Sequence, residues 1–76
     1  MRAPDARFLD DLRQVTTSEI MWDPGDGNYG GYAIYGIDPP AVPAIRAVAK
    51  NYGMRLQYYR DQRAVWINRK GAIFDD

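Results

Sequence analysis

The chain has no cysteine and no histidine among its 76 residues. Without cysteine it can form no disulfide and offers no thiolate to a substrate or a metal ion. Without histidine it lacks the residue that most often serves as a general base and as a zinc ligand. Catalysis by a Ser-His-Asp or Cys-His arrangement is therefore excluded. From this inventory we expect no enzymatic activity, no cofactor and no metal site.

Long hydrophobic runs are also missing. No apolar run, 32–35 included, is longer than four residues, whereas a membrane-spanning helix needs about 18 and the core of a signal peptide about 7–15. We therefore expect a cytoplasmic protein that is used as the whole chain and does not contact membranes.

A chain of 76 residues has room for one hydrophobic core, so we expect a single domain over 1–76. Ten basic and ten acidic residues balance, so no overall charge attracts the chain to nucleic acid. A core this small, without disulfides, is only marginally stabilising, and association into a homodimer stays an open alternative.

Hydrophobic spacing predicts two helices, one over 4–15 and one that starts at residue 40 or 41. Asp38 is expected to cap the second helix at its N-terminus, and Gly53 to end it in a left-handed conformation. The apolar stripes are expected to be Phe8, Leu9, Leu12 and Val15 in the first helix, and Val42, Ile45, Val48 or Ala49, and Tyr52 in the second.

Alternating apolar residues predict strands at 19–22, from Tyr29 or Tyr32 to Ile37, at 54–59 and at 64–68, with a further short edge strand at 72–74. The order of elements is then α-β-β-α-β-β. This order indicates an α+β domain in which two helices pack on a small antiparallel sheet of about four strands.

The C-terminal hairpin offers one candidate binding face. A four-residue turn, 60–63, places Tyr59 opposite Ala64, Gln57 opposite Trp66, and Arg55 opposite Asn68. The core face then holds Met54, Leu56, Tyr58, Val65 and Ile67. The other face holds Arg55, Tyr59 and Trp66, close to Arg60, Arg63 and Arg69. Three readings stay open: the first helix covers this face, a protein binds it, or unpaired bases stack on it.

The loop that joins the first two strands offers a second, acidic candidate, formed by Asp23, Asp26, Tyr29 and Tyr32. Residues 1–45 carry three basic and seven acidic groups, and residues 46–76 carry seven basic and three acidic groups. The balanced chain is therefore dipolar if its halves stay apart in the fold. The loop is favoured slightly as a partner-binding site, because exposed loops often carry function.

In its small size, lack of catalytic groups and Gly/Pro/Tyr-rich loops the chain resembles the small inhibitor proteins that phages use against bacterial defence systems, such as anti-CRISPR proteins. The resemblance implies an intracellular protein-binding module, an inhibitor or adaptor that blocks a surface of a protein or ribonucleoprotein. The alternative is a nucleic-acid-binding accessory protein that uses the Arg/Tyr/Trp face of the sheet.

Overall fold

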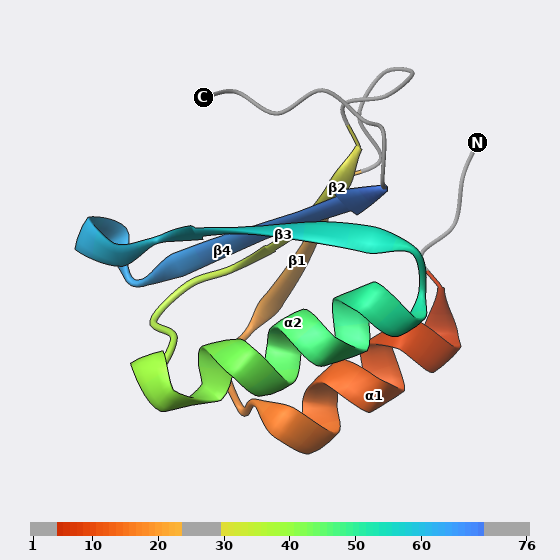
Figure 1. Cartoon of the computed structure of the whole chain (residues 1–76), viewed down its shortest axis with the longest axis horizontal. Helices are drawn as coiled ribbons and strands as arrows, with labels where there is room; N and C mark the ends of the chain where they lie inside the picture. Colours follow the sequence, from red (N-terminus) through yellow and green to blue (C-terminus); the bar gives the residue numbers. More distant parts are fainter. Residues whose placement is uncertain (1–4, 24–29, 70–76) are drawn as a thin grey trace.

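Two helices cover one face of a four-stranded antiparallel sheet in the computed structural model, which describes residues 5–23 and 30–69 (Figure 1). The elements in chain order are α1 (Ala6–Val15), β1 (Ile20–Asp23), β2 (Gly31–Ile34), α2 (Val42–Asn51), β3 (Met54–Tyr59) and β4 (Ala64–Arg69). The predicted α+β class and the order α-β-β-α-β-β are confirmed.

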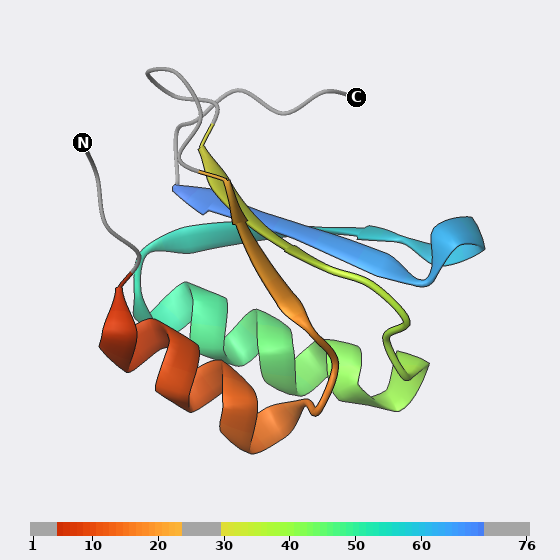
Figure 2. The same cartoon turned by 180° about the vertical axis from the view of Figure 1, so that it is seen from behind.

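The strands lie in the order β1-β2-β4-β3, and every neighbouring pair is antiparallel. The first half of the chain therefore supplies one side of the sheet, and the second half supplies the other. The helices follow the same division, since α2 packs against β3 while α1 lies toward β1 and β2 (Figures 1 and 2). The two halves of the chain lie side by side and do not interleave.

The first helix begins later than predicted, at Ala6, because Asp5 acts as its N-cap. One carboxylate oxygen of Asp5 accepts hydrogen bonds from the backbone N–H groups of Arg7 and Phe8, at 3.0 and 3.4 Å. These bonds satisfy two donors that have no partner within the helix. Phe8 and Leu12 of the predicted stripe are fully buried.

The second helix has a different start from the predicted one. Pro39–Ala41 forms a 3-10 turn, and α2 begins only at Val42. The side chain of Asp38 makes no capping hydrogen bond, although its carbonyl accepts from the N–H of Ala41 at 2.8 Å. The predicted end is confirmed, since Gly53 has φ +68 and donates to the carbonyl of Lys50 at 3.1 Å.

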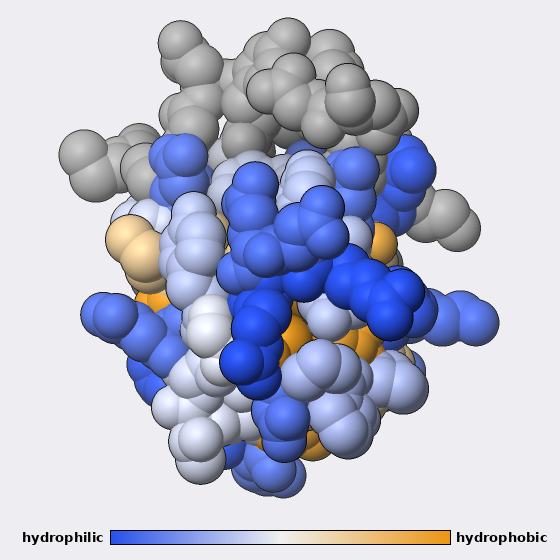
Figure 3. Space-filling model, turned by 90° about the vertical axis from the view of Figure 1, so that its left-hand side faces the viewer, coloured by the Kyte–Doolittle hydropathy of each residue, from blue (hydrophilic) through white to orange (hydrophobic). Residues whose placement is uncertain are grey.

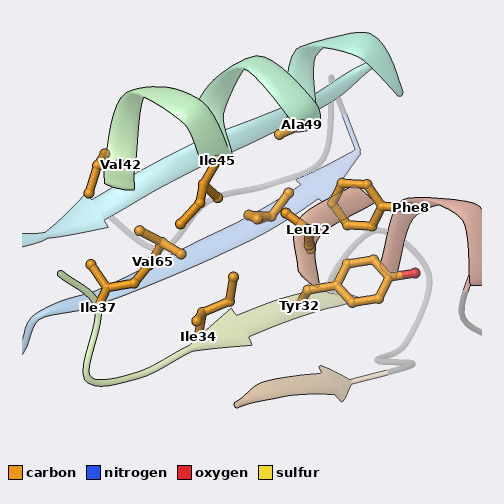
Figure 4. Packing of buried hydrophobic residues seen from close by; sticks show 10 residues of the cluster. Phe8, Leu12, Tyr32, Ile34, Ile37, Val42, Ile45, Ala49 and Val65 are labelled. Atoms are coloured by element: carbon orange, nitrogen blue, oxygen red, sulfur yellow. The ribbon is translucent and has the colours of Figure 1, made fainter. Parts of the chain in front are cut away.

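The core lies between the helices and the sheet (Figure 4). Val42, Ile45 and Ala49 point from α2 toward the sheet, as the sequence predicts. The fully or nearly fully buried core residues are Phe8, Leu12, Tyr32, Ile34, Ile37, Val42, Ile45, Ala49, Val65 and Ile67.

The β3–β4 hairpin has the predicted register, with Tyr59 opposite Ala64, Gln57 opposite Trp66 and Arg55 opposite Asn68. The first hairpin is shorter than predicted, because β2 ends at Ile34. The chain then turns at Gly36, which has φ +66, and the N–H of Ile37 donates to the carbonyl of Arg63 at 2.8 Å. This bond ties the end of the first hairpin to the turn of the second. The predicted strand at 72–74 lies outside the described residues.

Candidate functional site

The side of the sheet away from the helices is called the outer face below. Side chains alternate between the two faces of a strand, so the pairing register fixes which residues share this face. It comprises Met21 and Asp23 of β1, Gly31 and Ala33 of β2, Arg55, Gln57 and Tyr59 of β3, and Ala64, Trp66 and Asn68 of β4. Neither α1 nor α2 lies on this side of the sheet (Figures 1 and 2).

Trp66 lies near the middle of the outer face, opposite Ala33 on one side and Gln57 on the other. A Cβ atom at Gly31 would lie 2.8 Å from Cζ2 of Trp66 and would collide with the carbonyl of Ile67. The indole ring therefore lies over a strand position that has no side chain, and Trp66 stays partly exposed. The reading in which the first helix covers Trp66 is wrong, because α1 packs on the opposite face.

Exposed polar and charged residues form the β3–β4 turn, at one end of the outer face. Arg60, Asp61, Gln62 and Arg63 are all exposed, and hydrophilic side chains gather at this end of the molecule (Figure 3). Arg63 has φ 50 and ψ 47, a left-handed conformation that glycine adopts more readily than arginine. In the described part of the chain, Arg63 is the one residue other than glycine that has a positive φ.

The separation of charge along the sequence becomes a separation in space. Between Val42 and Arg63 the chain carries five cations and one carboxylate, and these residues form α2, β3 and the β3–β4 turn. The first half, which supplies α1, β1 and β2, is acidic. The described part of the molecule is therefore acidic at the β1 side and basic at the β3 side.

The residues of the acidic loop have different positions. Asp23 is exposed at the end of β1, whereas Asp26 and Tyr29 lie outside the described residues. Tyr32 is 6% exposed. Its hydroxyl oxygen accepts from the N–H of Asp5 at 3.0 Å, and its ring packs on Phe8 with 4.9 Å between centroids. Tyr32 thus joins α1 to the sheet and offers little surface to a partner.

The residues of the basic face lie together. Arg55, Tyr59 and Trp66 share the outer face, and Arg60 and Arg63 lie at its end. Arg69 belongs to β4 by its backbone, while its side chain lies outside the described part. Met21 is an outer-face residue that was not predicted, and it is 51% exposed. The alternation Ile20-Met21-Trp22 could have placed it there.

Among the described residues, no cluster of three or more aspartate or glutamate side chains is placed to hold a metal ion. The hydrogen bond from Tyr52 to Asp11, burial, and the negative charges of Asp11 and Asp5 raise the pKa of Tyr52 to about 12. This contact joins the two helices and has a structural role.

No helix in residues 5–23 and 30–69 is long and apolar enough to cross a membrane. Comparison of the chain with protein-family models, with curated proteins and with solved structures gives no match.

Proposed function

We propose that the protein is a small protein-binding module, an inhibitor or adaptor that covers a surface of a larger protein or ribonucleoprotein. The observation that carries this proposal is the outer face, where Trp66, Tyr59 and Arg55 lie together on a side of the sheet that neither helix covers. Tryptophan, tyrosine and arginine are the residues that most often dominate the binding energy of protein interfaces.

The shape of this surface also supports binding to a large, complementary partner. Seven side chains of the outer face are at least partly exposed, while Gly31, Ala64 and Asn68 are buried. The exposed and partly exposed residues are Met21, Asp23, Ala33, Arg55, Gln57, Tyr59 and Trp66. A stable interface needs about 800 Å² from each partner. A face as broad as the sheet is suited to an interface of that size.

The charge at the β3 side of the outer face, together with the β3–β4 turn, indicates the chemistry of the partner. Arg55, Arg60 and Arg63 are exposed, and Asp61 is the one carboxylate among the residues of β3 and the turn. An acidic surface with some apolar area is complementary to this arrangement, and complementary charge raises both the association rate and the specificity.

The backbone at Arg63 gives independent support. A non-glycine residue in the left-handed region costs about 1–2 kcal/mol relative to its ordinary conformation. Glycine would remove this cost, yet an exposed arginine occupies the position. Local strain of this kind is common where a side chain is needed for binding.

The experiment is capture of the partner with the tagged full chain from the cells that make it, followed by a measurement of Kd with the purified partner. We expect Trp66→Ala to raise Kd by about 30-fold, which corresponds to the about 2 kcal/mol of a hot-spot residue. Trp22→Ala is the matched control, because Trp22 lies on the helix-covered face. This control is expected to lower Tm and leave Kd unchanged at a temperature where the variant is folded.

A nucleic-acid ligand is the alternative for the same face, since arginine and aromatic side chains also bind unpaired bases. Filter binding with mixed-sequence RNA and DNA at low salt separates the two. Retention that falls steeply with salt would favour nucleic acid, because cations that contact phosphates release counterions. Absence of retention at tens of micromolar protein would leave the protein partner as the ligand. A bacterial defence complex is a suitable first target, given the resemblance to phage inhibitors.

A further inference from the structure

In the described part of the chain, β3 is an edge strand of the sheet. β3 pairs with β4 through all six of its residues, and no described strand pairs with its other edge. An edge strand presents backbone N–H and C=O groups that can pair with another extended chain. The β3 edge is nearest the viewer in Figure 1.

Natural sheets usually protect such an edge, and the two edges of this sheet differ in that respect. β1 has four residues, ends at Asp23 and follows Glu19, so it is short and flanked by charge. β3 has six residues, contains no proline, no lysine and no acidic residue, and keeps a continuous register without a bulge. Of the usual protective devices, β3 retains one charged side chain, Arg55.

The helix-facing side chains of β3 are incompletely covered. Leu56 pairs with Ile67, and Tyr58 pairs with Val65. Ile67 and Val65 are fully buried in the central strand, whereas Leu56 and Tyr58 are only partly buried. An added strand would cover this remaining apolar surface, and burial of apolar area contributes about 25 cal/mol per Å².

The charge near the β3 edge indicates what kind of chain could pair with it. Arg46 and Lys50 are exposed and lie one turn apart on α2. They are on the flank away from Tyr52, which contacts Phe8 and Asp11 of α1. That flank lies toward the β3 edge, so the edge is cationic on its helix side and carries Arg55 on its outer side. A second copy paired through β3 would bring the cations of both α2 helices together.

From these observations we infer that β3 binds an extended, acidic segment of the protein partner as an added strand. Backbone hydrogen bonds to the β3 edge hold the segment. Its side chains alternate between the outer face and the helix-covered face of the sheet and contact the residues there. Apolar residues of the segment cover Leu56 and Tyr58, and its carboxylates approach Arg55 and the turn arginines. This inference rests on the proposed function, because it names the part of the partner that is bound.

The test uses the full chain, isotope-labelled for amide NMR, and a defined probe. The probe is an acetylated and amidated peptide of alternating glutamate and valine, matched in length to β3. Saturable shift changes that centre on the amides of 54–59 are expected at millimolar peptide. Arg55→Glu should raise Kd at least about tenfold through like-charge contact, and Arg13→Glu, the same change on exposed α1, should leave it unchanged.

Two further peptides separate strand pairing from simple charge attraction. The same peptide with every backbone nitrogen methylated has no hydrogen-bond donors and should not bind. A peptide with lysine in place of glutamate should bind at least about tenfold more weakly. The inference is overturned if the first probe does not bind at millimolar concentration, if its shifts centre on β1, or if methylation leaves Kd unchanged. None of these results bears on whether partner binding depends on Trp66. The inference about β3 can therefore fail while the proposed function stands.

Discussion

Tyr52 joins the two helices at the level of single residues. Its hydroxyl donates a hydrogen bond to Oδ2 of Asp11 at 2.6 Å, and its ring lies edge-on to Phe8 at 5.2 Å. Asp11 lies outside the predicted apolar stripe of the first helix, and it is nevertheless half-buried. The spacing of polar residues in one helix does not reveal that a tyrosine from a second helix approaches it.

The raised pKa of Tyr52 predicts that the protein loses stability in alkaline solution. The ordinary pKa is 10.0, and the folded value is about 12. The unfolded chain therefore loses the phenolic proton first, so the stabilisation is complete below pH 10 and is lost as the pH rises toward 12. The free energy of unfolding, measured with urea at one pH unit below and one pH unit above 10.0, gives the size of this loss. Tyr52→Phe should reduce the decline, and Tyr35→Phe, at an exposed position, should not.

Arg63 carries the backbone strain of the β3–β4 turn. We expect Arg63→Gly to stabilise the fold by about 1 kcal/mol, which corresponds to about 4–8 °C in Tm, and to weaken partner binding at the same time. Gln62→Gly in the same turn is the control. It should lower Tm, because Gln62 does not have a positive φ. A lower Tm for Arg63→Gly would contradict the account of strain at this position.

The elements themselves were largely predictable from local patterns. The register of the β3–β4 hairpin follows from the agreement of two alternating patterns across a four-residue turn. The end of α2 follows from Gly53, where a left-handed residue is required. The start of α2 did not follow from the sequence, since two consecutive prolines produced a 3-10 turn in which the Asp38 side chain does not cap.

The packing of α2 predicts which substitution the fold tolerates least. Ile45 is fully buried between α2 and the sheet. Ile45→Ala should cost about 2–4 kcal/mol, a large part of the about 5 kcal/mol expected for so small a domain. A circular dichroism melt measures the loss. Arg46→Ala, one residue further on and exposed, should change stability by less than about 0.5 kcal/mol. Equal melts for the two variants would contradict this packing.

At the scale of the whole molecule, the topology converts a charge pattern along the chain into a charge pattern in space. The sequence predicted that the halves differ in charge, but it could not tell whether they stay apart. That depends on the strand order β1-β2-β4-β3, which is set by long-range pairing between β2 and β4. The same limit applied to Tyr32, which the sequence offered both as the start of a strand and as a binding residue of the acidic loop. It lies in β2 and packs against α1.

Two candidate surfaces of opposite charge therefore lie at different sides of the molecule. Asp23 is at the acidic side, and Arg55 and the β3–β4 turn are at the basic side. The proposed function assigns partner binding to the basic side. A charge reversal at one side should leave the other side unaffected, because exposed charges separated by more than about 8–10 Å are largely screened at physiological salt.

Paired charge reversals, compared in one binding assay with the captured partner, test this assignment most directly. Arg60→Glu with Arg63→Glu should raise Kd at least about tenfold, because like charges then face the acidic partner. Asp23→Arg with Asp26→Arg should leave Kd unchanged, and both double variants should keep Tm within a few degrees. If the aspartate variant loses binding and the arginine variant keeps it, the acidic side is the interface and the assignment to the basic side, formed by β3 and the β3–β4 turn, is wrong.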